Sequence, residues 1–96
     1  MSVKLIVSLH CNLDAEDTFE QELKKLVEAS AAEDGCLKYE LYQSDGERCR
    51  YVIIEEWQND NALEKHHEAV HYKHFIRVLP VLLAKPAKVK RLTRLV

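Results

Sequence analysis

The chain has 96 residues, 47% of them hydrophobic, and its 14 Lys and Arg residues nearly balance its 16 Asp and Glu residues. These values are typical of one globular domain over residues 1–96, and the near-neutral charge argues against a nucleic-acid partner. No apolar run approaches the roughly 20 residues of a membrane span, so we expect no membrane partner. The first residues lack the layout of a signal peptide, and we expect a cytoplasmic protein.

Cysteine and glycine usage narrows the chemistry further. The three cysteines (Cys11, Cys36 and Cys49) are odd in number and form no CxxC pair, so neither a disulfide framework nor a zinc knuckle is indicated. With only Gly35 and Gly46, the chain has no glycine-rich loop to hold a nucleotide phosphate. The nucleophile motif GxSxG is absent as well. We therefore expect no cofactor and no acyl-transfer chemistry.

The first part of the chain predicts a strand and a long helix. Residues 3–9 alternate and are rich in aliphatic side chains, which indicates a strand. Asp14 is a suitable N-cap for a helix over residues 15–33. Side chains at i, i+4, i+7, i+8 and i+11 from Phe19 form one stripe suited to burial. Gly35 suits a left-handed conformation that ends this helix.

Two strands joined by a turn are predicted next. Residues 36–43 alternate, and this pattern places Leu37 and Tyr39 on the same face of a strand. The turn signal Ser-Asp-Gly-Glu occupies residues 44–47, and residues 48–57 form the third strand.

The third strand is predicted to lie at the centre of the sheet. Its period of two places Ile53, Glu55 and Trp57 on one face, where helices folding back would build a pocket around a carboxylate and an indole. Residues 51–54 are apolar on both faces, which a half-exposed sheet does not require. A second copy of the chain is the simplest cover for the outer face, so we expect a homodimer.

Helical residues dominate the segment after the third strand. Asn59 or Asp60 is expected to cap a helix over residues 61–68, and a break near Val70 precedes a second helical run over residues 71–79. Pro80 removes an amide donor, so we expect a kink or a restart there. Residues 89–95 form the last predicted strand. The element order is that of an α+β, ferredoxin-like β-α-β-β-α-β sandwich.

Four segments resemble the antibiotic biosynthesis monooxygenase domain family. They are residues 34–41 after the first helix, residues 54–57 at the end of the third strand, His66 with His71 five residues later, and residues 79–86. The resemblance covers nearly the whole chain and implies the dimeric α/β-barrel of that family. It also implies a cofactor-independent monooxygenase that oxidises a quinol or a related small aromatic compound with O2.

Several residues could supply the base, the hydrogen-bond donor and the dry cavity that such chemistry needs. His66 or His71 could act as the base, because imidazole titrates near neutrality. Glu55 could orient that histidine, or take the proton itself if burial raises its pKa. The remaining candidates stack a flat ring, donate a hydrogen bond or line the cavity, and they are Trp57, Tyr39, Tyr72, Phe19 and Phe75.

Other interpretations stay open at this point. The same His and Glu residues could serve an isomerase or a signal-processing enzyme on a small oxygenated metabolite, with Lys73 binding a phosphate or oxyanion. The pocket could also hold a ligand without chemistry, as in a stress-response dimer. A zinc site from His67, His71 and His74 would need one unbroken helix, so we expect no metal.

Overall fold

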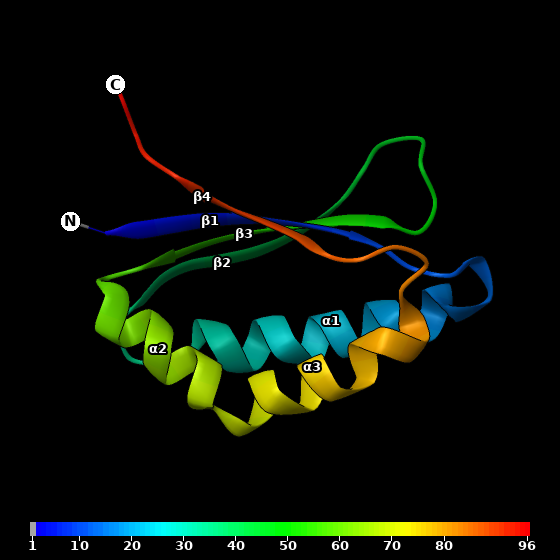
Figure 1. The fold of residues 1–96 in the computed structure, drawn as a ribbon, viewed down its shortest axis with the longest axis horizontal. Coiled ribbons are helices and arrows are strands. Elements are labelled where there is room, and N and C mark those ends of the chain that lie inside the picture. Colours follow the sequence, from blue (N-terminus) through cyan, green and yellow to red (C-terminus); the bar gives the residue numbers. More distant parts are fainter. Residues whose placement is uncertain (1) are drawn as a thin grey trace.

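The computed structural model describes residues 2–96 and places all its helices on one face of a four-stranded sheet (Figure 1). This arrangement confirms the predicted β-α-β-β-α-β fold. The elements in chain order are β1 (Val3–His10), the 3-10 helix η1 (Leu13–Ala15), α1 (Glu16–Ala31), β2 (Cys36–Gln43), β3 (Arg50–Trp57), α2 (Asp60–Glu68), α3 (Val70–Leu82) and β4 (Lys88–Leu92).

The sheet has the order β2-β3-β1-β4, and every neighbouring pair is antiparallel. Leu5 lies opposite Glu55, and Val7 lies opposite Ile53, so β1 and β3 present these side chains to the same face. That face packs against the helices, and Ile53 and Glu55 are both buried. The alternation predicted for β3 is therefore confirmed.

The stripe on α1 packs against this inner face of the sheet. Phe19, Leu23 and Ser30 are fully buried, and Leu26 is nearly so. The expected N-cap at Asp14 is wrong, because a single 3-10 turn precedes α1 and includes this residue. Ala15 takes the cap position, and its methyl group cannot accept a hydrogen bond.

The expectation that Leu37 shares a face with Tyr39 is also wrong. The pairing of β2 with β3 shifts between Cys36 and Lys38, as in a β-bulge. One extra residue at this point turns the side chain of Leu37 outward, where it is 58% exposed, whereas Tyr39 is buried. The bulge thus brings Tyr39 to the inner face, next to its pairing partner Glu55.

A single extended residue separates α2 from α3. The side chain of Asn59 accepts a hydrogen bond from the amide of Ala62 at 2.9 Å, as expected of an N-cap. Ala69 has φ −70° and ψ 145°, and this conformation ends α2 one residue before the predicted break. The helix does not restart at Pro80, because α3 continues through it to Leu82. Pro80 lies in the last turn, so the donor that it lacks removes one i→i−4 hydrogen bond near the end of the helix and does not divide it.

Gly35 lets the chain pass closely beneath α2. Its φ is +82°, and a Cβ at this position would lie 2.7 Å from the Cβ of Ala62. The amide of Gln58 donates a hydrogen bond to the carbonyl oxygen of Gly35 at 2.7 Å. These contacts hold the segment after α1 against the start of α2, one turn before His66.

The outer face of the sheet carries no helix (Figure 1). Ile6 and Ile54 lie directly opposite each other on this face and are half-buried, as is Val52. Within residues 2–96, the helices are all too short or too polar to cross a bilayer.

Candidate functional site

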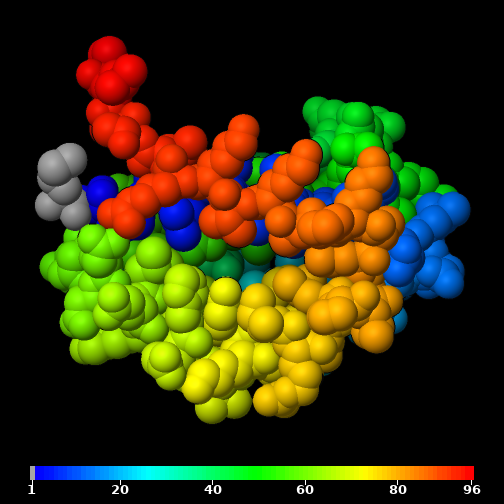
Figure 2. Space-filling model, viewed as in Figure 1, coloured from blue at the N-terminus to red at the C-terminus, as the bar shows by residue number. Residues whose placement is uncertain are grey.

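A cavity of about 90 Å³ lies between the inner face of the sheet and α3. Its walls are largely apolar and include Leu26, Ile53, Phe75 and Leu79. β4 contributes Val89, and Figure 2 shows the surface hollowed between β4 and α3. The polar side chains that line this cavity are Tyr39, Glu55, His67 and Tyr72.

Glu55 places a carboxyl group in this apolar cavity. The residue is 5% exposed, and the indole Nε1 of Trp57 donates a hydrogen bond to its Oε1 at 2.8 Å. Burial raises the pKa of Glu55 above its usual value, because a desolvated carboxylate is costly. The hydrogen bond from Trp57 opposes that effect, since it stabilises the charged form. A carboxyl group balanced in this way is suited to exchanging a proton with a ligand.

Tyr39 and Tyr72 bring two phenol groups to the same cavity. Burial is the main cause that raises the pKa of each, and the charge of Glu55 adds to it. Both side chains therefore keep their protons at neutral pH and can donate hydrogen bonds. The cavity thus combines a carboxyl group that can be protonated or charged, that of Glu55, with two phenol groups that donate hydrogen bonds.

Trp57 and Phe19 do not line the cavity, in contrast to the role considered for them. Trp57 is fully buried beneath it, with its ring centroid 4.5 Å from that of His66. Phe19 is also fully buried and packs edge-on against Tyr51 at 5.6 Å. Of the two phenylalanines, only Phe75 reaches the wall. The structure therefore places Trp57 as the side chain that holds Glu55.

His66 and His71 meet at a carboxylate that the sequence did not single out. Oε2 of Glu33 lies 2.6 Å from Nδ1 of His66 and 2.7 Å from Nε2 of His71. Burial lowers the pKa of His66, and Glu33 opposes this by stabilising the charged ring. Neither histidine lines the cavity. The expected pairing of a histidine with Glu55 is replaced by this contact with Glu33.

The same three side chains could hold a metal ion. Their ligand atoms all lie within 4.8 Å of one another. The other combination considered from the sequence, His67 with His71 and His74, is overturned by the extended residue Ala69 between α2 and α3. His74 instead lies 3.1 Å from a carboxylate oxygen of Glu22.

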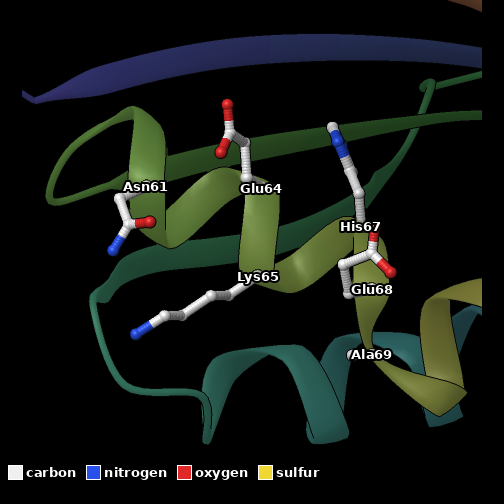
Figure 3. Close-up of a pocket in the computed structure, with 6 residues that line it drawn as sticks. All are labelled: Asn61, Glu64, Lys65, His67, Glu68 and Ala69. Carbon is white, nitrogen blue, oxygen red and sulfur yellow. The ribbon is translucent and has the colours of Figure 1, made fainter.

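His67 reaches the rim of the cavity and was missed as a site residue. His67 is exposed, and its ring lies 4.7 Å from that of Tyr72. No spacing signal distinguishes it from His66 beside it. Figure 3 shows an open hollow over α2 in which Glu64 and His67 point toward the sheet and Lys65 points away. Such divergent side chains do not converge on a common ligand.

Lys73 lies outside the cavity lining. It is exposed, and its Nζ lies 3.2 Å from a carboxylate oxygen of Glu68. Lys73 is therefore not placed to bind a phosphate or oxyanion in the cavity.

Comparison with known proteins gives a consistent picture. The family profile described as antibiotic biosynthesis monooxygenase matches residues 2–78. YcnE of Bacillus subtilis, whose name marks it as a candidate monooxygenase, is 32% identical over 78 residues, covering 81% of this chain and 82% of YcnE. The uncharacterized protein sll1783 of Synechocystis is 32% identical over 77 residues, or 80% of this chain. The match covers 52% of sll1783, so this chain spans about half of that relative.

Solved structures share the fold over nearly the whole chain. PA3566 from Pseudomonas aeruginosa superimposes with a TM-score of 0.93 at 35% sequence identity. The superposition covers 99% of this chain and 95% of PA3566.

Proposed function

The chain belongs to the antibiotic biosynthesis monooxygenase family, and from that premise we propose that it oxidises a quinol or a related small aromatic compound with O2, without a cofactor. The observation that carries this proposal is the buried carboxyl group of Glu55 in an otherwise apolar cavity. A phenolic hydroxyl is the polar group that such a cavity accommodates best, because it donates a hydrogen bond from the edge of a flat apolar ring.

Glu55 is the base in this proposal. It takes the phenolic proton, and the phenolate that forms is electron-rich enough to pass an electron to O2. Recombination at a ring carbon then yields a hydroperoxide. Loss of water from the hydroperoxide leaves a new carbonyl group on the ring. This group tautomerises to the hydroxyl group of the product, a hydroxyquinone. The quinol supplies all four electrons that reduce O2, one oxygen atom enters the ring and the other leaves as water.

The other polar side chains support this reaction. The phenol groups of Tyr39 and Tyr72 donate to the substrate oxygen as negative charge develops on it. Trp57 orients Glu55 through the 2.8 Å hydrogen bond from its indole nitrogen. The apolar walls exclude water, which strengthens these electrostatic contacts. His66 and His71, considered first as the base, lie outside the cavity lining and have no step in this scheme.

Oxygen consumption by the chelator-treated protein, with a panel of reduced quinols and naphthols, tests the proposal. We expect uptake above the autoxidation rate for at least one compound. We expect Glu55→Gln to lower that rate by about 10²- to 10⁴-fold, the range for loss of a general base. Glu56→Gln is the matched control, because Glu56 follows directly in β3 but points to the outer face.

Other outcomes separate the alternatives. No uptake across the panel, with ring compounds still binding, would favour a ligand-binding protein. Turnover without O2 would favour an isomerase. Equal rates for Glu55→Gln and the unchanged chain would refute the assignment of the base.

A homodimer is part of the same proposal. The outer face of the sheet presents a cross-strand pair of isoleucines, Ile6 and Ile54, and carries no helix. Tyr42 and Leu92 on neighbouring strands are 49% and 42% exposed. A second copy packed face to face would remove this apolar surface from water.

A further inference from the structure

Glu33, His66 and His71 come together from three separate parts of the chain. Glu33 follows α1, His66 lies in α2 and His71 lies in α3, and none of them lines the cavity assigned to the quinol. We propose that these three side chains form a binding site for a divalent transition-metal ion of the Zn2+ or Fe2+ type. This inference does not rest on the proposed oxygenase reaction.

The donor set is the first argument. Two imidazoles and one carboxylate suit Zn2+ and Fe2+, and the set is that of mononuclear sites which keep open coordination positions. The ligand atoms are Nδ1 of His66, Nε2 of His71 and a carboxylate oxygen of Glu33, all within 4.8 Å of one another. No other element of the chain has to move toward them.

The distances set how far the ligands must adjust. Metal–ligand bonds of about 2.0–2.2 Å hold neighbouring ligand atoms roughly 3 Å apart. The contacts of Glu33 with His66 and His71 are 2.6 and 2.7 Å, so an entering ion moves the Glu33 oxygen away from each nitrogen by a few tenths of an ångström. The three ligand atoms span up to 4.8 Å, so the two imidazole nitrogens move toward each other. The side chains of Glu33 and His71 are 17% and 28% exposed and have room to do so.

The surroundings of His66 are the second argument. The ring is 1% exposed and packs against those of Trp57 and Tyr72, at centroid distances of 4.5 and 4.9 Å. When Nδ1 donates its proton to Glu33, the lone pair of Nε2 is left buried, with no donor among the residues that the structure describes. An ion on Nδ1 moves the proton to Nε2, where the surrounding aromatic faces accept it weakly. The bound ion therefore removes an unpaired buried acceptor.

The position of the site explains what the ion would do. It joins the segment after α1 to α2 and α3 on either side of the extended residue Ala69. Its open coordination positions lie on the side of Glu33 and His71, which solvent reaches. Binding should therefore stabilise the packing of the three helices and raise the melting temperature, by an amount that grows with the logarithm of the ratio of ion concentration to Kd.

Direct metal binding tests this site. Untagged, chelator-treated protein is titrated with Co2+ while its visible absorption is followed, and with Zn2+ in a calorimeter. We expect one ion per chain with each probe, together with a higher melting temperature. Glu33→Gln and His71→Ala should each weaken binding by at least about tenfold. The matched control is His74→Ala, because His74 lies beside Glu22 in a similar histidine–carboxylate pair elsewhere on α3.

Two results would overturn the site. One is the absence of saturable Co2+ and Zn2+ binding at millimolar concentration, and the other is unchanged affinity in His71→Ala. His71 is half-buried, so this variant decides the matter even if Glu33→Gln fails to fold. Oxygen uptake by the metal-free chain is a separate measurement, so either proposal can fail while the other stands.

Discussion

At the scale of single residues, the carboxyl group of Glu55 is notable because it is buried beside an apolar cavity. It is 5% exposed, and its hydrogen bond from Trp57 offsets only part of the cost of burying a charge. A chain that needed only a core residue here would place an aliphatic side chain, as Ile53 does two positions earlier on the same face. A buried carboxyl group beside a cavity is an expected feature of a proton-transfer site.

Replacing Glu55 by Gln should change how stability depends on pH. The folded state raises the pKa of Glu55 above 4.5, so it holds the proton to a higher pH than the unfolded chain does. Stability linked to this group is therefore present at low pH and is lost as the pH rises through the folded pKa. Gln can still accept from Trp57 and carries no charge. We expect the free energy of unfolding of Glu55→Gln to exceed that of the unchanged chain at about pH 8, with the gap closing near pH 4.

Urea denaturation of both proteins across this pH range measures the difference. Using the difference between the two chains cancels the titration of all other groups. Parallel curves for the two proteins would show that the burial of Glu55 does not shift its pKa.

The sequence was enough to predict where some site residues lie, but it did not predict all of the residues that they contact. The period of β3 was enough to place Glu55 on the inner face, because alternation is a local property. The role of Glu33 could not be predicted in this way. It is one of 16 acidic residues, and its contacts with His66 and His71 depend on how α1 ends relative to α2 and α3. Only the folded chain brings these three together.

At the scale of elements, Gly35 is a point where two segments approach closely. Its backbone lies in the left-handed region, and Ala62 of α2 leaves no room for a Cβ. Gly46 in the β2–β3 turn also has a positive φ, of +74°, yet a Cβ there would meet no atom within 4 Å. The two glycines thus separate the effect of backbone conformation from that of close packing.

Substituting each glycine by Ala should give unequal losses of stability. Both variants pay for a left-handed residue with a side chain, about 1–2 kcal/mol. Gly35→Ala must in addition displace α2, and overpacking typically adds about 1–3 kcal/mol. Chemical denaturation of the two variants measures the difference. Equal losses would show that α2 yields to the added methyl group at little cost.

The elements also show where local patterns failed. The alternation of residues 36–43 predicted the strand correctly but not the bulge that turns Leu37 outward, because a bulge is defined by pairing with β3. The 3-10 turn before α1 was missed for a related reason. Asp14 is a good cap by residue type, but the hydrogen bond from the amide of Ala15 to the carbonyl oxygen of Asn12 starts the turn earlier.

At the scale of the whole molecule, the sheet is covered on one side only. The helices bury the inner face, and the outer face leaves Ile6, Val52 and Ile54 half-buried in the single chain. Charged residues of both signs surround them, including Glu40 and Lys90, which pair across the strands with Ile54 and Ile6. An apolar centre within a mixed-charge rim is the composition of many interfaces between identical subunits.

A charge at the centre of this face should separate the proposed dimer. We expect the unchanged chain to sediment as a dimer at micromolar concentration. Ile54→Lys should sediment as a monomer, because an unpaired charge would be buried in the interface. Val81→Lys is the control, since Val81 is 76% exposed on α3, away from the sheet. A monomer in the unchanged chain, or dissociation by both substitutions, would contradict the assignment of this face.

The pairing of β4 with β1 also fixes an order of events during synthesis. β1 leaves the ribosome before β4, so the edge of β1 that pairs with β4 stays open until β4 has been synthesised. β1 can pair with β3 earlier, which leaves the other edge able to recruit strands from neighbouring nascent chains. All five residues of β4 are exposed, and three of them are Lys or Arg, so these charges discourage further strands once β4 has docked. Synthesis and docking of β4, rather than formation of the helices, is therefore the step that ends the exposure of this edge to aggregation.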